Sequence, residues 1–329
     1  MQTRRLGTTG PEVSALGLGC MGMSDLYGPA DRDEALATVR AALDAGVTLL
    51  DTGDFYGMGD NELLLRDALA GRDRDGVVLS VKFGALRGPD GSWLGIDGRP
   101  AAVKSALAYT LRRLGTDHVD VYRPARVDPA VPVEETAGAV GELVQAGWVR
   151  HLGLSEVGAD SLRRAHAVQP VADVQIEWSL VSRSVERNAL PSARELGVGF
   201  TPYGVLSRGL LSGHWTPDRR LGADDFRAYG PRFQGENLQR NLAVVEQLRA
   251  LAEEKGCTVA QLAIAWALAR GEHVVPLVGA RTRERLAESL GALDVQLSDE
   301  DLARAEQAAA GVAGERDTPE HLAALDSER

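Results

Sequence analysis

Residues 33–51 read DEALATVRAALDAGVTLLD, and this stretch contains the unit that decides the fold. Its first part, Asp33–Ala45, has a helical pattern, and Gly46 follows at the position where glycine commonly ends a helix in a left-handed conformation. Val47–Asp51 is then a short apolar run that predicts a buried strand. A helix, a glycine and a strand in this order predict one repeat of an α/β fold with parallel strands.

This helix–glycine–strand unit recurs along the chain. Eight short apolar runs predict strands, helical patterns separate them, and glycines follow several of the helices, at positions 71, 115, 147 and 197 among others. Eight parallel strands are expected to close on themselves, so the sequence predicts an α/β fold of the (β/α)8 TIM barrel type. The predicted strands are Ser14–Gly19, Val47–Asp51, Val77–Lys82, Val119–Tyr122, His151–Ser155, Val171–Ile176, Val198–Tyr203 and Val274–Val278. The predicted helices are Asp33–Ala45, Asn61–Ala70, Ala101–Leu114, Glu134–Ala146, Asp160–Val168, Ser184–Leu196 and Thr258–Arg270.

Two short predicted strands precede the barrel, and a polar segment follows it. Arg4–Leu6 and Glu12–Ala15 predict an N-terminal β-hairpin that covers the bottom of the barrel. We expect one barrel domain over residues 1–329, with a polar tail over 314–329 that is either mobile or a strap across the barrel. The long segments 84–100 and 207–236 follow strands, so both are expected above the carboxyl ends of the strands, where barrels bind substrates.

The composition narrows the class of protein. The 329 residues are 44% hydrophobic, and 47 acidic side chains outnumber 36 basic ones, which gives a formal charge of −11. Without a dense block of Lys and Arg, nucleic acids and anionic membranes are poor partners, and no apolar run of about 18 residues predicts a membrane span. Cys20 and Cys257 suggest no disulfide framework, which favours a reducing cytoplasm, and the histidines have no metal-ligand spacing.

Residues 17–22, GLGCMG, spell the G-x-G-x-x-G pattern of dinucleotide-binding Rossmann folds. That pattern binds pyrophosphate only where a helix begins immediately behind it. Here the chain continues through residues 23–29, MSDLYGP, in which Gly and Pro indicate a loop. The sequence therefore argues against a Rossmann domain.

Three polar residues stand at or just beyond the ends of two neighbouring predicted strands. Asp51 ends the second strand, Lys82 ends the third, and Tyr56 follows Asp51 by five residues. Such residues converge at the mouth of a barrel, where a phenol can give its proton to a carbonyl oxygen. A phenol has an ordinary pKa of roughly 10, so Lys82 is expected to favour the tyrosinate and Asp51 to orient Lys82. Taken singly, each residue also fits a structural role as a turn cap, an ion pair or a packed ring.

The stretch around Tyr56 carries a family resemblance. Residues 51–57, DTGDFYG, resemble the D-T-A-x-x-Y-G signature of the aldo-keto reductase superfamily, and Lys82 falls on the catalytic lysine of that family. The likeness covers nearly the whole chain. It implies a barrel that reduces aldehydes or ketones to alcohols by hydride transfer from NADPH, with Tyr56 as general acid. A small-molecule carbonyl compound is then the expected partner, and no oligomeric state is predicted.

The same resemblance assigns residues to the cofactor. Ser155 and Gln175 would hold the nicotinamide carboxamide, although Glu156 stands where the family usually has Asn. Tyr203 would stack on the nicotinamide, and the following turn would offer backbone N–H groups to the pyrophosphate. Cations at a helix N-terminus oppose the helix dipole unless an anion binds, which favours NADPH over NADH. The remaining implied cofactor residues are Leu206 and Arg208 in the turn, Gly279, Arg281, Thr282 and Arg285 for the 2′-phosphate end, and Glu288 for the adenine.

One position departs from the family pattern. The usual histidine before Arg-x-Asp, which donates a hydrogen bond to the substrate oxygen, is replaced by Ala125, flanked by Arg123 and Arg126. The space left by the imidazole would admit a bulkier substrate, a water molecule or a polar group of the substrate. The alternative function is that of an NADPH-binding regulator or sensor with weak turnover. Pyridoxal or another aromatic aldehyde, as in the pyridoxal-reductase-like branch, is the secondary substrate prediction. The predicted pocket residues are Met23, Phe55, Trp93 and Ala125.

Overall fold

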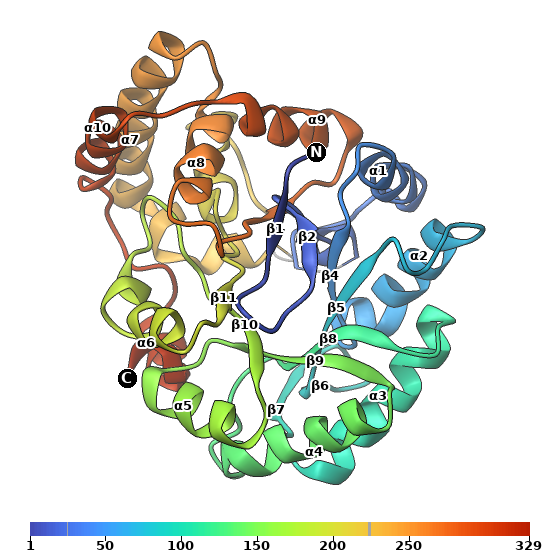
Figure 1. Cartoon of the computed structure of the whole chain (residues 1–329). Helices are drawn as coiled ribbons and strands as arrows, with labels where there is room; N and C mark the ends of the chain where they lie inside the picture. The colour runs from blue at the N-terminus through green and yellow to red at the C-terminus, as the bar shows by residue number, and fades with distance from the viewer. Residues whose placement is uncertain (25, 223–224) are drawn as a thin grey trace.

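The computed structural model describes residues 1–24, 26–222 and 225–329, and it confirms the predicted barrel. Its central sheet has eight strands in the order β11-β10-β9-β8-β5-β4-β3-β12, all parallel to their neighbours (Figure 1). Backbone hydrogen bonds from Phe200 to His273 and from Val275 to Phe200, both of 2.8 Å, join the two ends of this sheet into a ring. The strands are β3 Gly17–Gly19, β4 Leu49–Gly53, β5 Val78–Phe83, β8 Val119–Pro124, β9 Val149–Ser155, β10 Val171–Gln175, β11 Gly199–Phe200 and β12 Leu277–Gly279.

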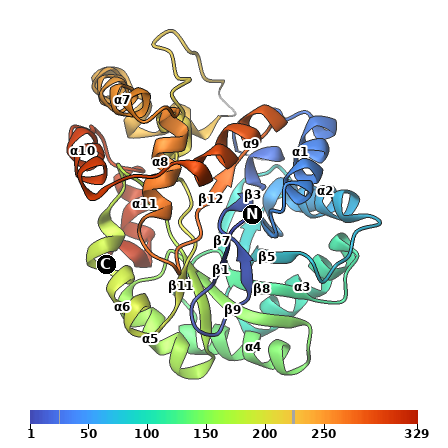
Figure 2. The ribbon, with the colours of Figure 1, turned by 45° about the horizontal axis from the view of Figure 1, so that its top comes forward.

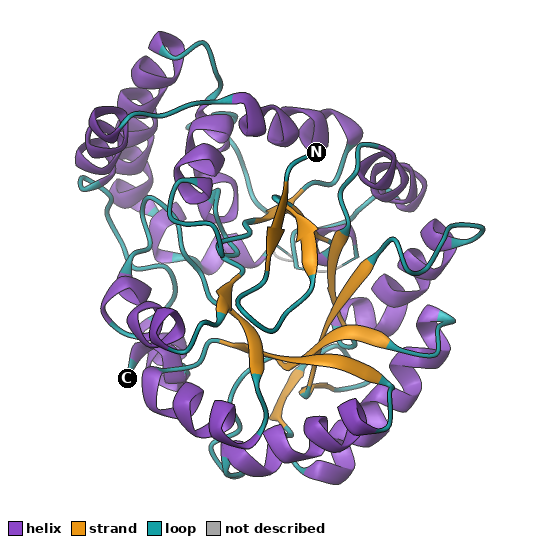
Figure 3. Cartoon of the chain, viewed as in Figure 1, coloured by secondary structure: helices purple, strands orange, loops and turns teal. Residues whose placement is uncertain are grey.

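Helices surround the strands on the outside of the ring (Figure 3). The prediction missed α7, α10 and α11. It also ran one helix through Ser184–Leu196, where the structure has a 3-10 turn and a separate helix that meet at Asn188. Pro191 lacks the N–H that a continuous helix would need there, so the helix restarts just before it. No helix in the described part of the chain is both long enough and apolar enough to cross a bilayer. The helices are α1 Arg32–Asp44, α2 Asp60–Leu69, α3 Pro100–Leu114, α4 Val133–Gln145, α5 Ala159–Val168, α6 Ala189–Glu195, α7 Gly235–Glu254, α8 Val259–Leu268, α9 Arg283–Leu290, α10 Asp299–Ala309 and α11 Pro319–Ala324.

The N-terminal hairpin lies across the centre of the ring in Figure 1, as predicted. It consists of β1 (Thr3–Arg5) and β2 (Glu12–Ser14), paired antiparallel. Its turn touches the start of β11 so closely that a Cβ on Gly7 would lie 2.5 Å from the Gly199 nitrogen. Gly7 also has a φ of +64°, so only glycine fits this contact without strain. The predicted strand Ser14–Gly19 is therefore divided, with Ser14 in the hairpin and the barrel strand beginning at Gly17.

A second hairpin rises after β5, inside the segment predicted as a long loop. It pairs β6 (Ala85–Arg87) with β7 (Trp93–Ile96) in antiparallel register. The other long segment, 207–236, carries short 3-10 turns at Ser207–Ser212, Phe226–Tyr229 and Pro231–Phe233, while residues 223 and 224 lie outside the described part. Asp25, in the Gly-rich loop after β3, also lies outside it.

The C-terminal segment is a strap, one of the two forms predicted for it. After α10 it passes through Arg316, forms α11 and ends in a 3-10 turn at Asp326–Glu328. Figures 1 and 2 both show the end of the chain beside α6. Arg316 is 6% exposed and Ser327 4% exposed, so the strap is anchored by buried polar side chains.

Candidate active site

The structure brings Asp51, Lys82 and Tyr56 together at the carboxyl ends of the strands. Asp51 and Lys82 lie on the neighbouring strands β4 and β5, and the Lys82 ammonium donates a hydrogen bond to Asp51 Oδ1. Tyr56 begins the 3-10 turn after β4, and Lys82 Nζ lies 5.5 Å from the centre of its ring. All three side chains are at most 6% exposed, so their charges and dipoles act in a largely water-free site.

The second oxygen of Asp51 joins the three residues to the far side of the barrel. Asp51 Oδ2 accepts hydrogen bonds of 2.8 Å from Ser80 Oγ and from Gln175 Nε2. Asp51 thus holds Lys82 with one oxygen and a predicted nicotinamide-binding residue with the other. This geometry orients the ammonium beneath the Tyr56 ring.

Burial sets the protonation of these groups. It raises the pKa of Tyr56 well above its ordinary value, the Asp51 charge raises it further, and Arg126 opposes both. Burial also lowers the pKa of Lys82, while Asp51 opposes that change. The Tyr56 phenol therefore keeps its proton at neutral pH, which is the state that a proton donor requires.

A buried polar network continues from Ser80 across the interior, and sequence reasoning missed it. Arg123 is 0% exposed, and its Nη2 donates to Ser80 Oγ and to both carboxylate oxygens of Asp173, each at 3.0 Å. Thr201 donates to Asp173 from another strand end. Gly153 leaves room for this network, because a Cβ there would lie 2.9 Å from Asp173 Oδ1 and 3.0 Å from Arg123 Cζ. Arg123 is thus a structural residue that points into the barrel.

Ala125, predicted to stand where the family usually has histidine, packs against Tyr56. Ala125 is 2% exposed and forms a small apolar cluster with Phe55, Tyr56 and Ala85. The ring centre of Phe55 lies 4.7 Å from that of Tyr56 and 5.8 Å from that of Trp93, which is 52% exposed. Two of the four predicted pocket residues, Phe55 and Ala125, therefore adjoin Tyr56, and a third, Trp93, contacts Phe55. The fourth, Met23, is 4% exposed in the main core, and Met21 packs against the Phe55 cluster instead.

The residues assigned to the nicotinamide line one side of this mouth. Ser155 ends β9, Gln175 ends β10, and Tyr203 is half-buried just beyond β11. Ser155 Oγ is buried and has no hydrogen-bond partner among the residues that the structure describes. A buried hydroxyl without a partner costs about 1–3 kcal/mol, so this site fits a ligand with a polar group such as a carboxamide. Within the described residues, no three His, Cys, Asp or Glu side chains gather as metal ligands.

Glu156, the departure from the family's Asn, is fully occupied by protein groups. Its Oε1 accepts from the Glu177 backbone at 3.1 Å, from the Tyr203 hydroxyl at 2.6 Å and from Arg316 at 3.1 Å. Its Oε2 accepts from Arg316 at 2.7 Å and from Ser327. Glu156 therefore fixes Tyr203 and anchors the strap, and it has no oxygen left for a carboxamide.

The turn after Tyr203, which is predicted to face the pyrophosphate, has an unusual backbone. Ser207, Arg208 and Gly209 follow one another with φ values of +47°, +58° and +95°. Left-handed angles at non-glycine residues are strained and occur where a site requires them. The Arg208 guanidinium binds Asp317 of the strap at 2.7 Å and lies 4.7 Å from the Phe226 ring centre, and Leu206 packs against the main core.

The residues assigned to the 2′-phosphate end surround the N-terminus of α9, just beyond Gly279. Thr282 caps the helix by accepting from the Arg285 N–H, and Arg281 donates to two backbone carbonyls in the loop after β3. The Arg285 guanidinium is 41% exposed and binds Glu288 at 3.0 Å. His214, which sequence reasoning did not single out, contacts both Arg285 and Glu288. Arg281 is thus fixed by backbone carbonyls, whereas Arg285 remains partly exposed to solvent.

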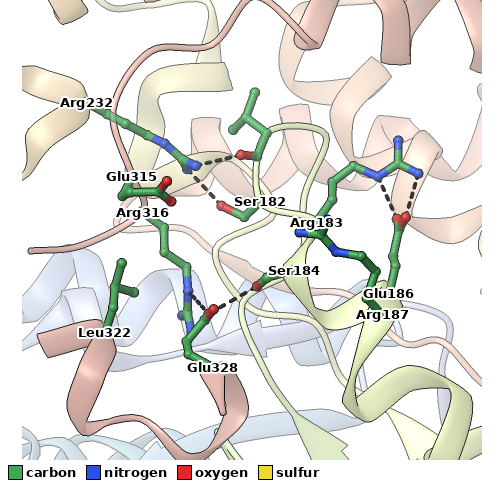
Figure 4. A pocket seen from close by; sticks show the side chains of 11 residues that line it. Ser182, Arg183, Ser184, Glu186, Arg187, Arg232, Glu315, Arg316, Leu322 and Glu328 are labelled. Atoms are coloured by element: carbon green, nitrogen blue, oxygen red, sulfur yellow. Dashed lines mark hydrogen bonds and ion pairs between the residues drawn. The ribbon is translucent and has the colours of Figure 1, made fainter. Parts of the chain in front are cut away.

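A cavity of about 440 Å³ lies beside the strap, away from the catalytic residues (Figure 4). It is bounded by residues 181–187, by Arg232 and by the strap from Glu315 to Glu328. Arg316 lines it with Glu328 bound at 2.7 Å, and the same guanidinium reaches Glu156. The cavity therefore ends at the anchor of the strap. Together, the closed ring of strands and the buried Asp51, Lys82 and Tyr56 at its carboxyl ends define a (β/α)8 barrel with a candidate catalytic site.

Comparison with known proteins identifies the family. The model of the Aldo/keto reductase family matches residues 15–310. A protein named probable aldo-keto reductase 1 from Glycine max is 42% identical over 305 residues, which are 92% of this chain and 87% of the relative. The glycerol dehydrogenase of Gluconobacter oxydans is 29% identical with a TM-score of 0.87, covering 96% of this chain and 98% of that one. The holo form of an aldo-keto reductase from Bacillus halodurans is 25% identical with a TM-score of 0.78, and both chains are covered in full, at 100%.

The chain therefore belongs to the aldo/keto reductase family. It is an oxidoreductase of a family that acts on small-molecule carbonyl compounds and generally uses a nicotinamide cofactor.

Proposed function

We propose that this protein reduces aldehydes or ketones to alcohols with NADPH, with Tyr56 as the proton donor. The observation that carries the proposal is the buried Tyr56 phenol, kept protonated beside the Lys82–Asp51 pair. NADPH supplies a hydride to the carbonyl carbon. Tyr56 gives its proton to the carbonyl oxygen and regains one from solvent, so carbonyl, NADPH and one proton become alcohol and NADP⁺.

Lys82 and Asp51 act on the Tyr56 phenol as a unit. As the proton leaves, negative charge develops on the phenol oxygen, and the neighbouring ammonium stabilises it. Asp51 keeps that ammonium charged against the effect of burial and fixes its direction. Neutralising Asp51 would therefore weaken proton donation even though Asp51 does not touch the substrate.

The cofactor proposal rests on the unpaired hydroxyl and on the cations near α9. Ser155 Oγ and the Gln175 amide fit the carboxamide, and the Tyr203 ring, fixed by its hydrogen bond to Glu156, fits the nicotinamide face. Arg285 at the helix N-terminus fits a phosphate, with Arg281 and Thr282 beside it. A 2′-phosphate is the group that distinguishes NADPH from NADH.

The test is NADPH oxidation with a panel of aldehydes, followed by the loss of near-ultraviolet absorbance, for the wild type and Tyr56→Phe. We expect turnover in the wild type and a loss of about 10²–10⁴-fold in Tyr56→Phe, the usual contribution of a general acid. Tyr109→Phe is the matched control, because Tyr109 is 62% exposed on α3. Equal rates in Tyr56→Phe and the control would refute the role of Tyr56.

Ala125 supports a second candidate, an NADPH-binding regulator or sensor with weak turnover. The missing donor at the substrate oxygen can cost about 10²–10³-fold in rate. Tight NADPH binding with no reduction of any carbonyl in the panel would favour this candidate over the enzyme.

Aromatic aldehydes, including pyridoxal, are the proposed first substrates to test. Phe55 and Ala125 pack against Tyr56, and the exposed Trp93 ring packs against Phe55, so together they offer a surface for an aromatic ring. A preference for short aliphatic aldehydes over benzaldehydes would count against this substrate class.

A further inference from the structure

Arg126 stands beside the gap left at Ala125. Its Nη1 donates to the backbone carbonyl of Ala125 at 2.6 Å, so its guanidinium folds back toward the strand end. Ala125 in turn packs against Tyr56 and Phe55. Arg126 is half-buried, so it is neither enclosed in the core nor fully exposed to solvent. The structure therefore separates the two arginines that flank Ala125: Arg123 enters the barrel interior, and Arg126 stays at the mouth.

The charge of Arg126 reaches groups on several sides of the mouth. Burial is the largest influence on the pKa values of Tyr56, Lys82, Glu156 and Tyr203, and the positive charge of Arg126 lowers all four. These residues belong to the ends of four different strands or to the turns behind them. A cation that acts on all of them faces the centre of the mouth.

No acidic side chain of the described residues forms an ion pair with Arg126; its one side-chain hydrogen bond goes to a neutral carbonyl. The acidic groups around the mouth are engaged elsewhere, with Asp51 bound to Lys82 and Glu156 bound to Arg316. A half-buried guanidinium without an anion has lost hydration and gained little in return. The fork of N–H donors matches a carboxylate in particular.

We propose that Arg126 binds a carboxylate of the substrate, so that this enzyme prefers carbonyl compounds that carry one. The inference rests on the proposed carbonyl reduction and names its substrate class. The carbonyl carbon would lie at Tyr56, and the carboxylate would reach the guanidinium beside Ala125, where the family's imidazole is missing. The chain as a whole carries a formal charge of −11, which repels anions, so a local cation is needed to hold an anionic substrate.

The test compares 4-carboxybenzaldehyde with its neutral methyl ester, methyl 4-formylbenzoate, in the wild type and in Arg126→Met. We expect kcat/KM of the wild type to favour the carboxylate by at least about tenfold. Arg126→Met should lower kcat/KM for the carboxylate by about 10- to 100-fold, and that for the ester by less than about threefold, since one charge-assisted contact is lost. Arg126→Lys should recover part of the loss, because it keeps the charge without the fork.

Arg150→Met is the matched control, because Arg150 is exposed at the opposite end of β9. Equal kcat/KM for the acid and the ester in the wild type would overturn the proposal. So would an equal loss for both substrates in Arg126→Met, because Arg126 would then act on the reacting carbonyl rather than on a carboxylate.

A binding measurement separates this inference from the reaction itself. Calorimetric titration with benzoate and with benzamide, in the presence of NADPH, needs no turnover. Binding of benzoate but not benzamide, lost in Arg126→Met, would support the carboxylate site even if no carbonyl in the panel were reduced. Failure of benzoate to bind the wild type would overturn the inference, whatever the outcome for carbonyl reduction.

Discussion

Replacing Arg316 by Met should release the C-terminal strap and leave a buried charge behind. The Arg316 guanidinium donates to both oxygens of Glu156, at 3.1 and 2.7 Å, and to Glu328 at 2.7 Å. Glu156 is 0% exposed and cannot regain water without opening the site. The methionine fills similar volume but donates nothing, so the loss measures the ion pair rather than a cavity.

The magnitude follows from the pKa of Glu156. Burial alone would raise it, but Arg316 leads the groups that hold it at about 2, against an ordinary value of 4.5. A difference of about 2.5, at 1.36 kcal/mol for each pKa unit, corresponds to about 3 kcal/mol. Breaking a buried ion pair by removing one partner costs a similar 3–5 kcal/mol in general. Because the folded pKa is lowered, this stability is present above about pH 4.5 and is lost as the pH falls toward about 2.

The assay is urea unfolding at neutral pH, followed by tryptophan fluorescence. Arg304→Met is the control, because the Arg304–Glu254 pair at 2.8 Å is about half exposed on both sides and should contribute less than about 1 kcal/mol. The double variant Glu156→Gln/Arg316→Met should recover part of the stability, since it also removes the buried charge of Glu156. A loss in Arg316→Met no larger than that of the control would refute the reasoning.

Three other changes test separate parts of the structure. Gly153→Ala places a methyl group against the buried Arg123 guanidinium and should lower the free energy of unfolding in urea by about 1–3 kcal/mol. An unchanged unfolding midpoint would show that the network can move to accommodate the methyl group. Burial, and then the charge of Glu62, raise the pKa of Asp54 to about 7. The free energy of unfolding should therefore fall by up to about 4 kcal/mol as the pH rises from about 4 to 7. Thermal unfolding of Asp54→Asn should lack this dependence on pH. Arg285→Ala should weaken NADPH binding about tenfold or more and NADH binding little, as measured by fluorescence titration; equal losses would contradict the 2′-phosphate assignment.

The barrel was predictable because its signals are local. Each strand is a short apolar run, and each helix has its own pattern and glycine stop, so eight strands were found in the right order. Helix α10 was missed although Ser298 and Asp301 form a capping box at its start, which is a readable signal. The closure of the ring was predicted from the number of strands, because eight parallel strands commonly close into a barrel that leaves no free edge.

The clustering of the candidate catalytic residues was predictable for a similar reason, but the buried polar network that supports them was not. Asp51 and Lys82 end adjacent strands, so strand order alone brings them together. Arg123 and Asp173 meet across the interior, from strands β8 and β10 that are not neighbours, and nothing in either segment encodes that contact. The direction of the Arg126 side chain could not be predicted either. Arg126 follows the end of its strand, so the alternation of side chains along a strand does not apply to it.

Glu156 shows how a departure from a family pattern is explained by a distant residue. The φ of Glu156 is +49°, a left-handed angle that Asn adopts more readily than Glu. The longer side chain then reaches past the mouth to Arg316, 160 residues later in the strap. Since both oxygens of Glu156 are used there, our proposal gives the carboxamide contact to Ser155 and Gln175, and the strap becomes part of the support for Tyr203. The Glu156 side chain is therefore a structural group, and it has this role because Arg316 of the strap donates to both of its oxygens.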